Sequence, residues 1–186
     1  TNLNRDDTGA PKTCMFGGVM RGRISSQCLK RSWRKSDLFR DAIGEAGLGI
    51  RTRKLPQLVA DVLRERGVSE EYLEILMPKL SAFGNKDGNE NKKGNYTAQM
   101  VFYAPQDIAA VADAVERKLA DCSSAKEVKS LKGKELQECV TGADVRPVTL
   151  DIALFGRMVT SNAFANVEAA MQVAHAISTN KVMMES

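Results

Sequence analysis

The sequence has few of the residues that bind metals or form disulfides. Its 186 residues include four cysteines and one histidine, His175. The cysteines, Cys14, Cys28, Cys122 and Cys139, show no CxxC spacing. Zinc and redox sites need such ligands at short spacing, so we expect no metal centre, no redox pair and no cofactor. Unpaired thiols are typical of proteins from a reducing cytoplasm.

Long apolar runs are also missing. The longest strongly apolar stretch, Val148–Phe155, is much shorter than the ~20 residues that cross a bilayer as a helix. We therefore expect a cytoplasmic protein without membrane contact.

Acidic residues are scarce in one segment near the start of the chain. The net charge is only +4, but from Arg21 to Arg40 the sole acidic residue is Asp37. A basic run of this kind is most often a solvated helix face. It is also the pattern of a surface that binds a polyanion, and both interpretations remain open at this point.

The basic segment has the pattern of a hairpin followed by a helix. Gly17 and Gly18 tolerate the positive φ of a tight turn between two short extended runs that cover 13–24. Alternation in the second run places Arg21 and Arg23 on one face.

A helix toward Phe39 is expected next, capped by Ser25 or Ser26. On it we expect an apolar side formed by Leu29 and Trp33, with Trp33 in the core. Cations at helical spacing would share its other side: Lys30 with Arg34 and Arg31 with Lys35.

The middle of the chain reads as short helices. They are expected from Pro56 to a stop at Gly67, from Ser69 onward, over Pro105–Asp121 and over Lys126–Val140, with a polar loop at Gly84–Gly94. Then Val148–Phe155 is expected to form a buried strand, and Asn166 to cap a last helix that carries His175. This order predicts an α+β fold interrupted by a helical insertion.

The basic residues near the start of the chain predict a phosphate-binding surface. Arg5 and Lys12 precede the hairpin, and Arg21 and Arg23 lie on its second strand. The expected helix start adds exposed N–H groups and further cations, which favour binding of a polyanion backbone. Such contacts hold phosphates and read no base sequence.

Three runs of the sequence resemble the CasC family, the repeated crRNA-binding subunit of type I-E CRISPR Cascade. They are NLNRDDTGAPKTCMFGGVMRGRISSQCLKRSWR, LDIALFGRMVTS and AMQVAHAIST. The first covers about the first 35 residues, and the others lie between positions 148 and 180. The segment between them matches in placement more than in residues. Cys28 stands where the family commonly has serine.

The resemblance implies a modified RRM-like (ferredoxin-like) α+β palm with helical fingers. The expected parts are palm at 1–43, fingers at 44–145 and continued palm at 146–186. The family also has a strand before Thr1 and further palm and thumb after Ser186, so we expect a fragment whose palm is incomplete.

The resemblance also implies a non-catalytic protein that polymerises along guide RNA. Its partners would be crRNA, target DNA paired to the guide, other copies of itself and other Cascade subunits. The family's RNA-backbone residues map onto Arg5, Lys12, Ser25, Gln27, Lys30 and Arg34, to which the basic pattern adds Arg21, Arg23 and Arg31. Met158 maps onto a methionine that lies against displaced bases.

Two other functions remain open. Asp6 and Asp7, with Lys12, could serve a metal-dependent ribonuclease, although neighbouring carboxylates usually diverge and one of them is more simply paired with Arg5 or another cation. Alternatively, the helical insertion docks a protein partner and the basic face is incidental. For His175 a structural or interface role is expected.

Overall fold

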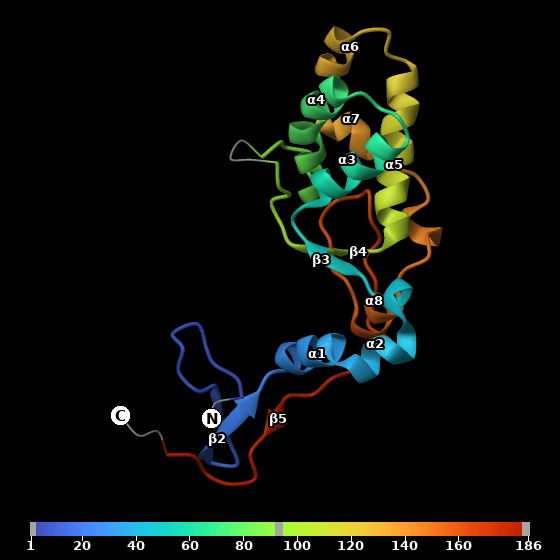
Figure 1. The fold of residues 1–186 in the computed structure, drawn as a ribbon. Coiled ribbons are helices and arrows are strands. Elements are labelled where there is room, and N and C mark those ends of the chain that lie inside the picture. Colours follow the sequence, from blue (N-terminus) through green and yellow to red (C-terminus); the bar gives the residue numbers. More distant parts are fainter. Residues whose placement is uncertain (1–2, 92–94, 184–186) are drawn as a thin grey trace. The chain divides into compact units, whose positions relative to one another are not determined.

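The structure, a computed structural model, describes residues 3–91 and 95–183 (Figure 1). The chain forms two compact units: the first is Thr1–Glu45 with Met171–Ser186, and the second is Ala46–Ala170. None of the described helices is long and apolar enough to cross a membrane.

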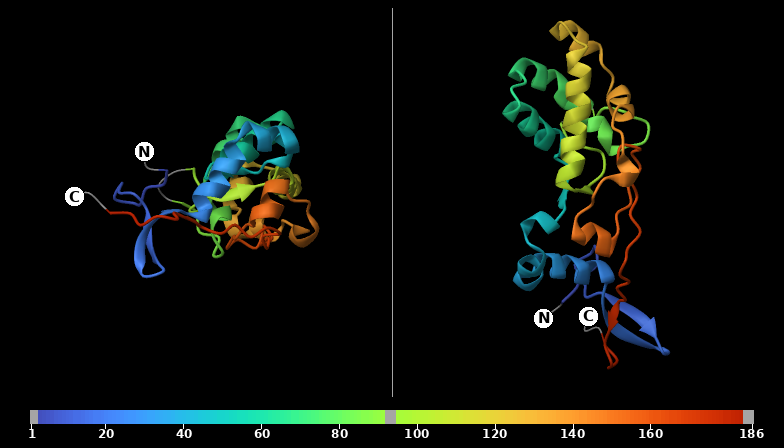
Figure 2. Two further views of the ribbon diagram at one scale, coloured as in Figure 1. Left: turned by 90° about the horizontal axis from the view of Figure 1, so that it is seen from below. Right: turned by 90° about the vertical axis from the view of Figure 1, so that its right-hand side faces the viewer.

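The first unit contains a three-stranded antiparallel sheet in the order β1-β2-β5. β1 (Thr13–Phe16) and β2 (Val19–Ile24) form the predicted hairpin. Its turn has Gly17 and Gly18 at φ of 63° and 75°, a region that glycine reaches without strain. β5 (Ala176–Ile177) pairs with the other edge of β2, so that the end of the chain runs beside its beginning (Figure 2).

Two helices follow the hairpin. α1 (Ser26–Lys35) begins after Ser25, whose Oγ accepts a hydrogen bond from the Cys28 amide at 3.3 Å, as the capping pattern predicted. It ends before Ser36, which caps α2 (Asp37–Ile43). α1 has no buried residue, and Trp33 is 39% exposed, so the prediction that Trp33 is core is wrong. No apolar side chain among the described residues of the first unit is buried, so this unit offers Trp33 no core to join.

The second unit is built around a helical core (Figure 1). Its helices and 3-10 turns are η1 (Glu45–Gly47, which spans the unit boundary), α3 (Leu55–Glu65), α4 (Glu70–Leu80), η2 (Ser81–Gly84), α5 (Pro105–Ala120), α6 (Ala125–Ser130), α7 (Gly133–Glu138), η3 (Ala143–Val145) and α8 (Leu150–Phe155). Leucine, valine and isoleucine side chains at helical spacing bury their faces against one another. Gly67, at φ +90°, ends α3 as predicted.

The predicted helix over Lys126–Val140 is two short helices, α6 and α7. In the predicted loop Gly84–Gly94, residues 85–91 form no helix or strand, whereas residues 92–94 lie outside the described residues.

A two-stranded antiparallel ribbon of β3 (Ile50–Thr52) and β4 (Val101–Tyr103) adjoins these helices in sequence. Alternation along β4 buries Val101 and Tyr103. The Tyr103 ring packs edge-on against Phe164 with centroids 5.2 Å apart, and burial raises the pKa of Tyr103 to about 12.

The prediction of a strand at Val148–Phe155 is wrong, because Leu150–Phe155 form helix α8. Gly156, at φ 79°, ends this helix. The buried Asp151 carboxylate accepts hydrogen bonds from Thr149 Oγ1 at 2.7 Å and from the Gly49 amide at 2.8 Å. These contacts stabilise a helical first turn that an extended strand would lose.

The predicted helix after Asn166 is also absent. The chain from Val167 to Ala174 is neither helix nor regular strand, and Ala176–Ile177 form β5. Pairing of this segment with β2 overrides the helix propensity of its alanine-rich sequence. The α+β fold class is confirmed, and an antiparallel sheet with a helix after its hairpin is consistent with an RRM-like palm.

Candidate nucleic-acid interface

The loop before the hairpin is organised around Asp6. The Asp6 Oδ1 atom accepts hydrogen bonds from the Thr8 hydroxyl at 2.7 Å and from the amides of Thr8 and Ala10, each at 2.9 Å. The Thr8 hydroxyl is the main cause of a lowered pKa of the Asp6 carboxyl. Asp6 thus stabilises the loop through these bonds, whereas the expectation was that Asp6 or Asp7 pairs with Arg5 or another cation. The Arg5 Nη1 atom donates instead to the Gly9 carbonyl.

Asn4 joins this loop to the strand and helix that follow. Its backbone carbonyl accepts from the Lys12 amide at 2.9 Å, and its Oδ1 accepts from the Ser25 amide at 2.9 Å. The Lys12 carbonyl in turn accepts from the Arg23 amide at 2.9 Å. The loop of Arg5 and Lys12 therefore lies against the end of β2 and the start of α1. Asn4 belongs to the NRDD run of the sequence, but no role was predicted for it.

Half of the predicted site residues lie on α1 and its cap, from Ser25 at the cap to Arg34 in the last turn. Ser25 is buried as the cap, Gln27 and Arg31 are exposed, and Lys30 and Arg34 are half-buried. The Ser26 amide donates to His175 Nδ1 at 2.9 Å. His175 is thus structural, as expected, although it lies in an extended segment rather than on a helix. The C-terminal segment thereby holds the helix start.

The two strand arginines differ in their surroundings. Arg21 donates from Nε to the Phe16 carbonyl at 3.1 Å and from Nη1 to the carbonyls of Ser178 and Thr179 at 3.0 and 2.6 Å. Arg21 therefore clamps the hairpin turn to the C-terminal segment. Arg23 Nε is buried and has no hydrogen-bond partner among the described residues.

A largely apolar pocket in the first unit includes Lys12 and Arg23. It lies between the loop before the hairpin, β2 and the C-terminal segment. Its other lining residues are Leu3, Asn4, Pro11, Thr13, Gly22, Ile24, Ala176, Ile177, Ser178 and Val182.

Met158 belongs to the second unit and projects into solvent. Its side chain is 88% exposed, whereas its neighbours Arg157 and Val159 are only 6% and 7% exposed. Met158 is therefore not part of the core of this unit. Backbone hydrogen bonds of 2.9 and 2.8 Å between Arg157 and Val167 close the loop that carries it.

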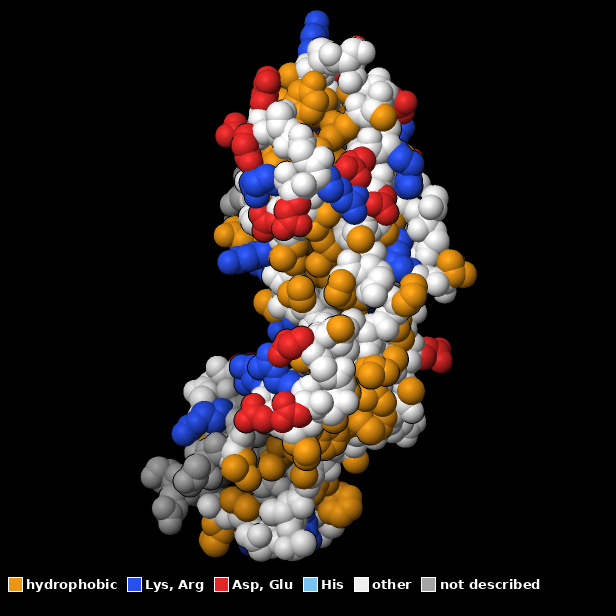
Figure 3. Space-filling model, turned by 45° about the vertical axis from the view of Figure 1, so that its right-hand side comes forward, with side chains coloured by type: hydrophobic (Ala, Val, Ile, Leu, Met, Phe, Trp, Pro, Cys, Tyr) orange, Lys and Arg blue, Asp and Glu red, His pale blue; other side chains and the backbone are white. Residues whose placement is uncertain are grey.

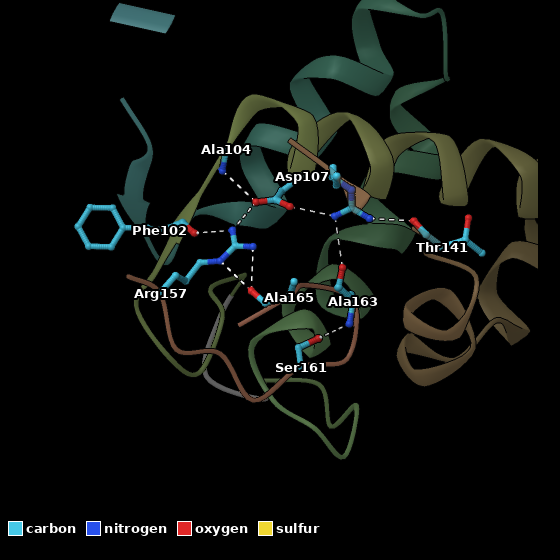
Figure 4. Close-up of polar contacts among 9 residues, drawn as sticks. Phe102, Ala104, Asp107, Thr141, Arg157, Ser161, Ala163 and Ala165 are labelled. Carbon is cyan, nitrogen blue, oxygen red and sulfur yellow. Dashed lines mark hydrogen bonds and ion pairs between the residues drawn. The ribbon is translucent and has the colours of Figure 1, made fainter. Parts of the chain in front are cut away.

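A buried ionic network lies beside this loop (Figure 4). Asp107, in the first turn of α5, accepts from Arg157 at Oδ2 and from Arg146 at Oδ1, the latter at 2.9 Å. Asp107 Oδ2 also accepts from the Ala104 amide at 3.0 Å, which caps α5. Sequence patterns gave no signal for this network, because its members are far apart along the chain.

Charges elsewhere on the second unit are largely balanced. Figure 3 shows Lys and Arg side chains interspersed with Asp and Glu over its helical part. Arg64 pairs with Asp61 and Glu70, and Arg66 pairs with Asp113 and Glu116. The basic excess predicted from the sequence is therefore a property of the first unit.

No group of three or more His, Cys, Asp or Glu in the described part of the chain is placed to hold a metal ion. What the first unit offers is cations, a capped helix start and backbone turns. These are groups that bind phosphates.

The fold is similar to that of protein chains from CRISPR assemblies. A chain titled "CRISPR RNA-guided surveillance complex" is 27% identical with a TM-score of 0.63, and the match covers 94% of this chain and 54% of that one. A second, titled "CRISPR RNA-guided surveillance complex, pre-nicking", is 26% identical with a TM-score of 0.61, with 96% and 49% covered. This chain thus spans about half the length of the solved chains that it matches.

The family described as CT1975-like protein (Cas_CT1975) matches residues 1–186, and the chain belongs to this family. Among curated proteins none matches.

Proposed function

We propose that this chain is a non-catalytic guide-RNA-binding subunit of a CRISPR surveillance complex of the Cascade type. Copies of it would lie side by side on crRNA in the cytoplasm, together with other Cascade subunits, as in the type I-E backbone that its sequence resembles. Residues 1–43 and 146–186 would then be parts of the palm, and residues 44–145 the helical fingers.

The observation that carries this proposal is the hydrogen-bonding of Asn4, which joins the loop of Arg5 and Lys12 to the start of α1. Two groups of basic residues that are separate in sequence thereby belong to one structural element. The names of the similar solved structures, which are RNA-guided complexes, support RNA as the polyanion.

The mechanism follows from the chemistry of these side chains. Cations and the helix start hold phosphates without reading sequence. Met158, whose side chain is exposed, would press between bases and displace one of them. The bases that stay stacked would remain free to pair with target DNA.

The proposal is tested by replacing Lys30 or Arg34 with alanine. Each change should weaken binding to unrelated RNA sequences equally and lower the log–log salt slope by ~0.7, the value for one lost contact to a single strand. Lys126→Ala, at an exposed position of α6, is the matched control and should change neither quantity. RNA titrations at several salt concentrations measure both.

A loss that depends on RNA sequence, or an equal loss in the Lys126 control, would contradict this surface. Magnesium-dependent cleavage of labelled RNA that disappears in Asp7→Asn would favour the ribonuclease alternative instead.

A further inference from the structure

The loop that carries Met158 is fixed from both sides. On one side the Arg157 guanidinium lies inside the loop and donates from Nε and Nη2 to the Ala165 carbonyl at 3.2 and 3.0 Å (Figure 4). On the other side the Val159 amide donates to Asn166 Oδ1 at 2.7 Å. The residues before and after Met158 are thus both held by direct hydrogen bonds, while its own side chain is in water.

Arg157 is itself held by Asp107. Its Nη1 donates to the Asp107 carboxylate and to the Phe102 carbonyl, the latter at 3.1 Å. The side chains of Asp107 and Arg157 are each only 2% exposed, and that of Arg146 is 8% exposed. Two cations therefore share one carboxylate in the interior, which leaves an excess positive charge there.

Burying these charged side chains costs desolvation free energy, so stability of the fold alone does not explain the network. Apolar side chains of similar size usually serve stability as well or better than a buried ion pair. The network instead fixes an orientation. The Arg157 guanidinium donates to three acceptors, and these hydrogen bonds hold both the side chain and the backbone beside it in one position. A long, flexible methionine on an immobilised backbone loses less freedom when it inserts between bases.

We infer that Asp107 and Asn166 are positioning residues for Met158. Asp107 acts through Arg157, and Asn166 acts through the amide of Val159. Neither touches RNA, and both hold the backbone from which the Met158 side chain displaces a base. This inference rests on the proposed function.

The experiment measures base displacement apart from RNA affinity. The intact chain is bound to single-stranded RNAs that carry 2-aminopurine at one position at a time, and the fluorescence reports which base is unstacked. We expect one bright position, which Met158→Ala abolishes. Asp107→Asn should lower this signal more than twofold while RNA affinity changes less than twofold. The double variant with Met158→Ala and Asp107→Asn should give the same displacement signal as Met158→Ala alone, because both changes act on one step.

Asp113→Asn is the matched control. It makes the same change on the same helix, but at a side chain that is 51% exposed and pairs with Arg66 on the surface. Its displacement signal should equal that of the unchanged chain.

A second pair of variants covers the case in which Asp107→Asn does not fold. Asn166 is exposed, so Asn166→Ala should fold and lower the displacement signal. Asn166→Asp, which keeps an oxygen acceptor for the Val159 amide, should restore it.

The outcomes separate the two claims. If Met158→Ala abolishes displacement but folded Asp107→Asn keeps it, or Asn166→Ala keeps it, the positioning role is overturned and the proposed function stands. If Met158→Ala itself keeps full displacement, the wedge mechanism fails and the inference fails with it.

Discussion

Different interactions stabilise the interior of each of the two units. Every buried apolar side chain in the described residues belongs to the second unit, whereas Ser25 is the one described residue of the first unit that is buried. The first unit is joined instead by hydrogen bonds between distant segments, such as those of Arg21 and His175. The unit with the predicted RNA residues is thus specified by directional contacts, and the other by packing.

The largest expected effect concerns the packed unit. Leu76 on α4 is fully buried, and Leu76→Ala should lower the free energy of unfolding by ~2–5 kcal/mol, the usual cost of such a cavity. Leu29→Ala, at a half-buried position of α1, should cost about 1 kcal/mol or less. Urea unfolding monitored by circular dichroism measures both. Equal losses would mean that the two units do not differ in packing.

A smaller effect is expected at the clamp of the first unit. Arg21→Ala removes three hydrogen bonds to carbonyls, each worth about 1 kcal/mol. The Ser178 amide, which donates to the Gly22 carbonyl at 2.9 Å, should then exchange its hydrogen faster, while α5 amides stay unchanged.

Arg31→Ala, at an exposed position of α1, is the control for the clamp and should leave exchange at Ser178 unchanged. If Arg21→Ala instead weakens RNA binding with no change in that exchange, Arg21 contacts phosphate and is no clamp.

The smallest effect is local and depends on pH. Hydrogen bonds lower the pKa of Asp6 in the folded loop, first through the Thr8 hydroxyl. The carboxylate therefore stabilises the loop at a pH above the ordinary aspartate range, and this contribution is lost as pH falls through the lowered pKa. Amide resonances of Thr8 and Ala10 should shift together in that acidic range. Asp6→Asn should remove the transition, and a transition that persists in this variant would assign it to another group.

Local signals in the sequence predicted the elements that depend on neighbouring residues. The Gly17-Gly18 turn, the Ser25 cap and the spacing of Ile108, Val111 and Val115 in α5 gave the right elements, because turn, cap and apolar face each act over a few residues.

The misses occurred where distant partners decide the structure. Val148–Phe155 is an apolar run too short to distinguish a buried strand from a helix by period, and the Gly49 amide that binds Asp151 comes from another part of the chain. Similarly, the segment of His175 has helix-forming alanines, but pairing with β2 makes it extended.

The sequence indicated which residues are candidates for the site, but not which other residues hold them in place. Motif and charge identified Lys12, Gln27 and Met158 as candidates. They gave no role to Asn4, and none to Asp107, whose arginine partners lie 39 and 50 residues away. Hydrogen bonds over such separations leave no periodicity in the sequence.

The first unit is made from two segments that precede and follow the second unit in sequence, and this has a consequence for synthesis on the ribosome. Arg21 and Ser178 are separated by 157 positions, so the contact between them cannot form until Ser178 has been translated. The second unit is continuous and emerges earlier, which allows it to fold while the hairpin still waits for its third strand. A nascent chain would therefore complete its proposed guide-binding surface after the helical unit has formed.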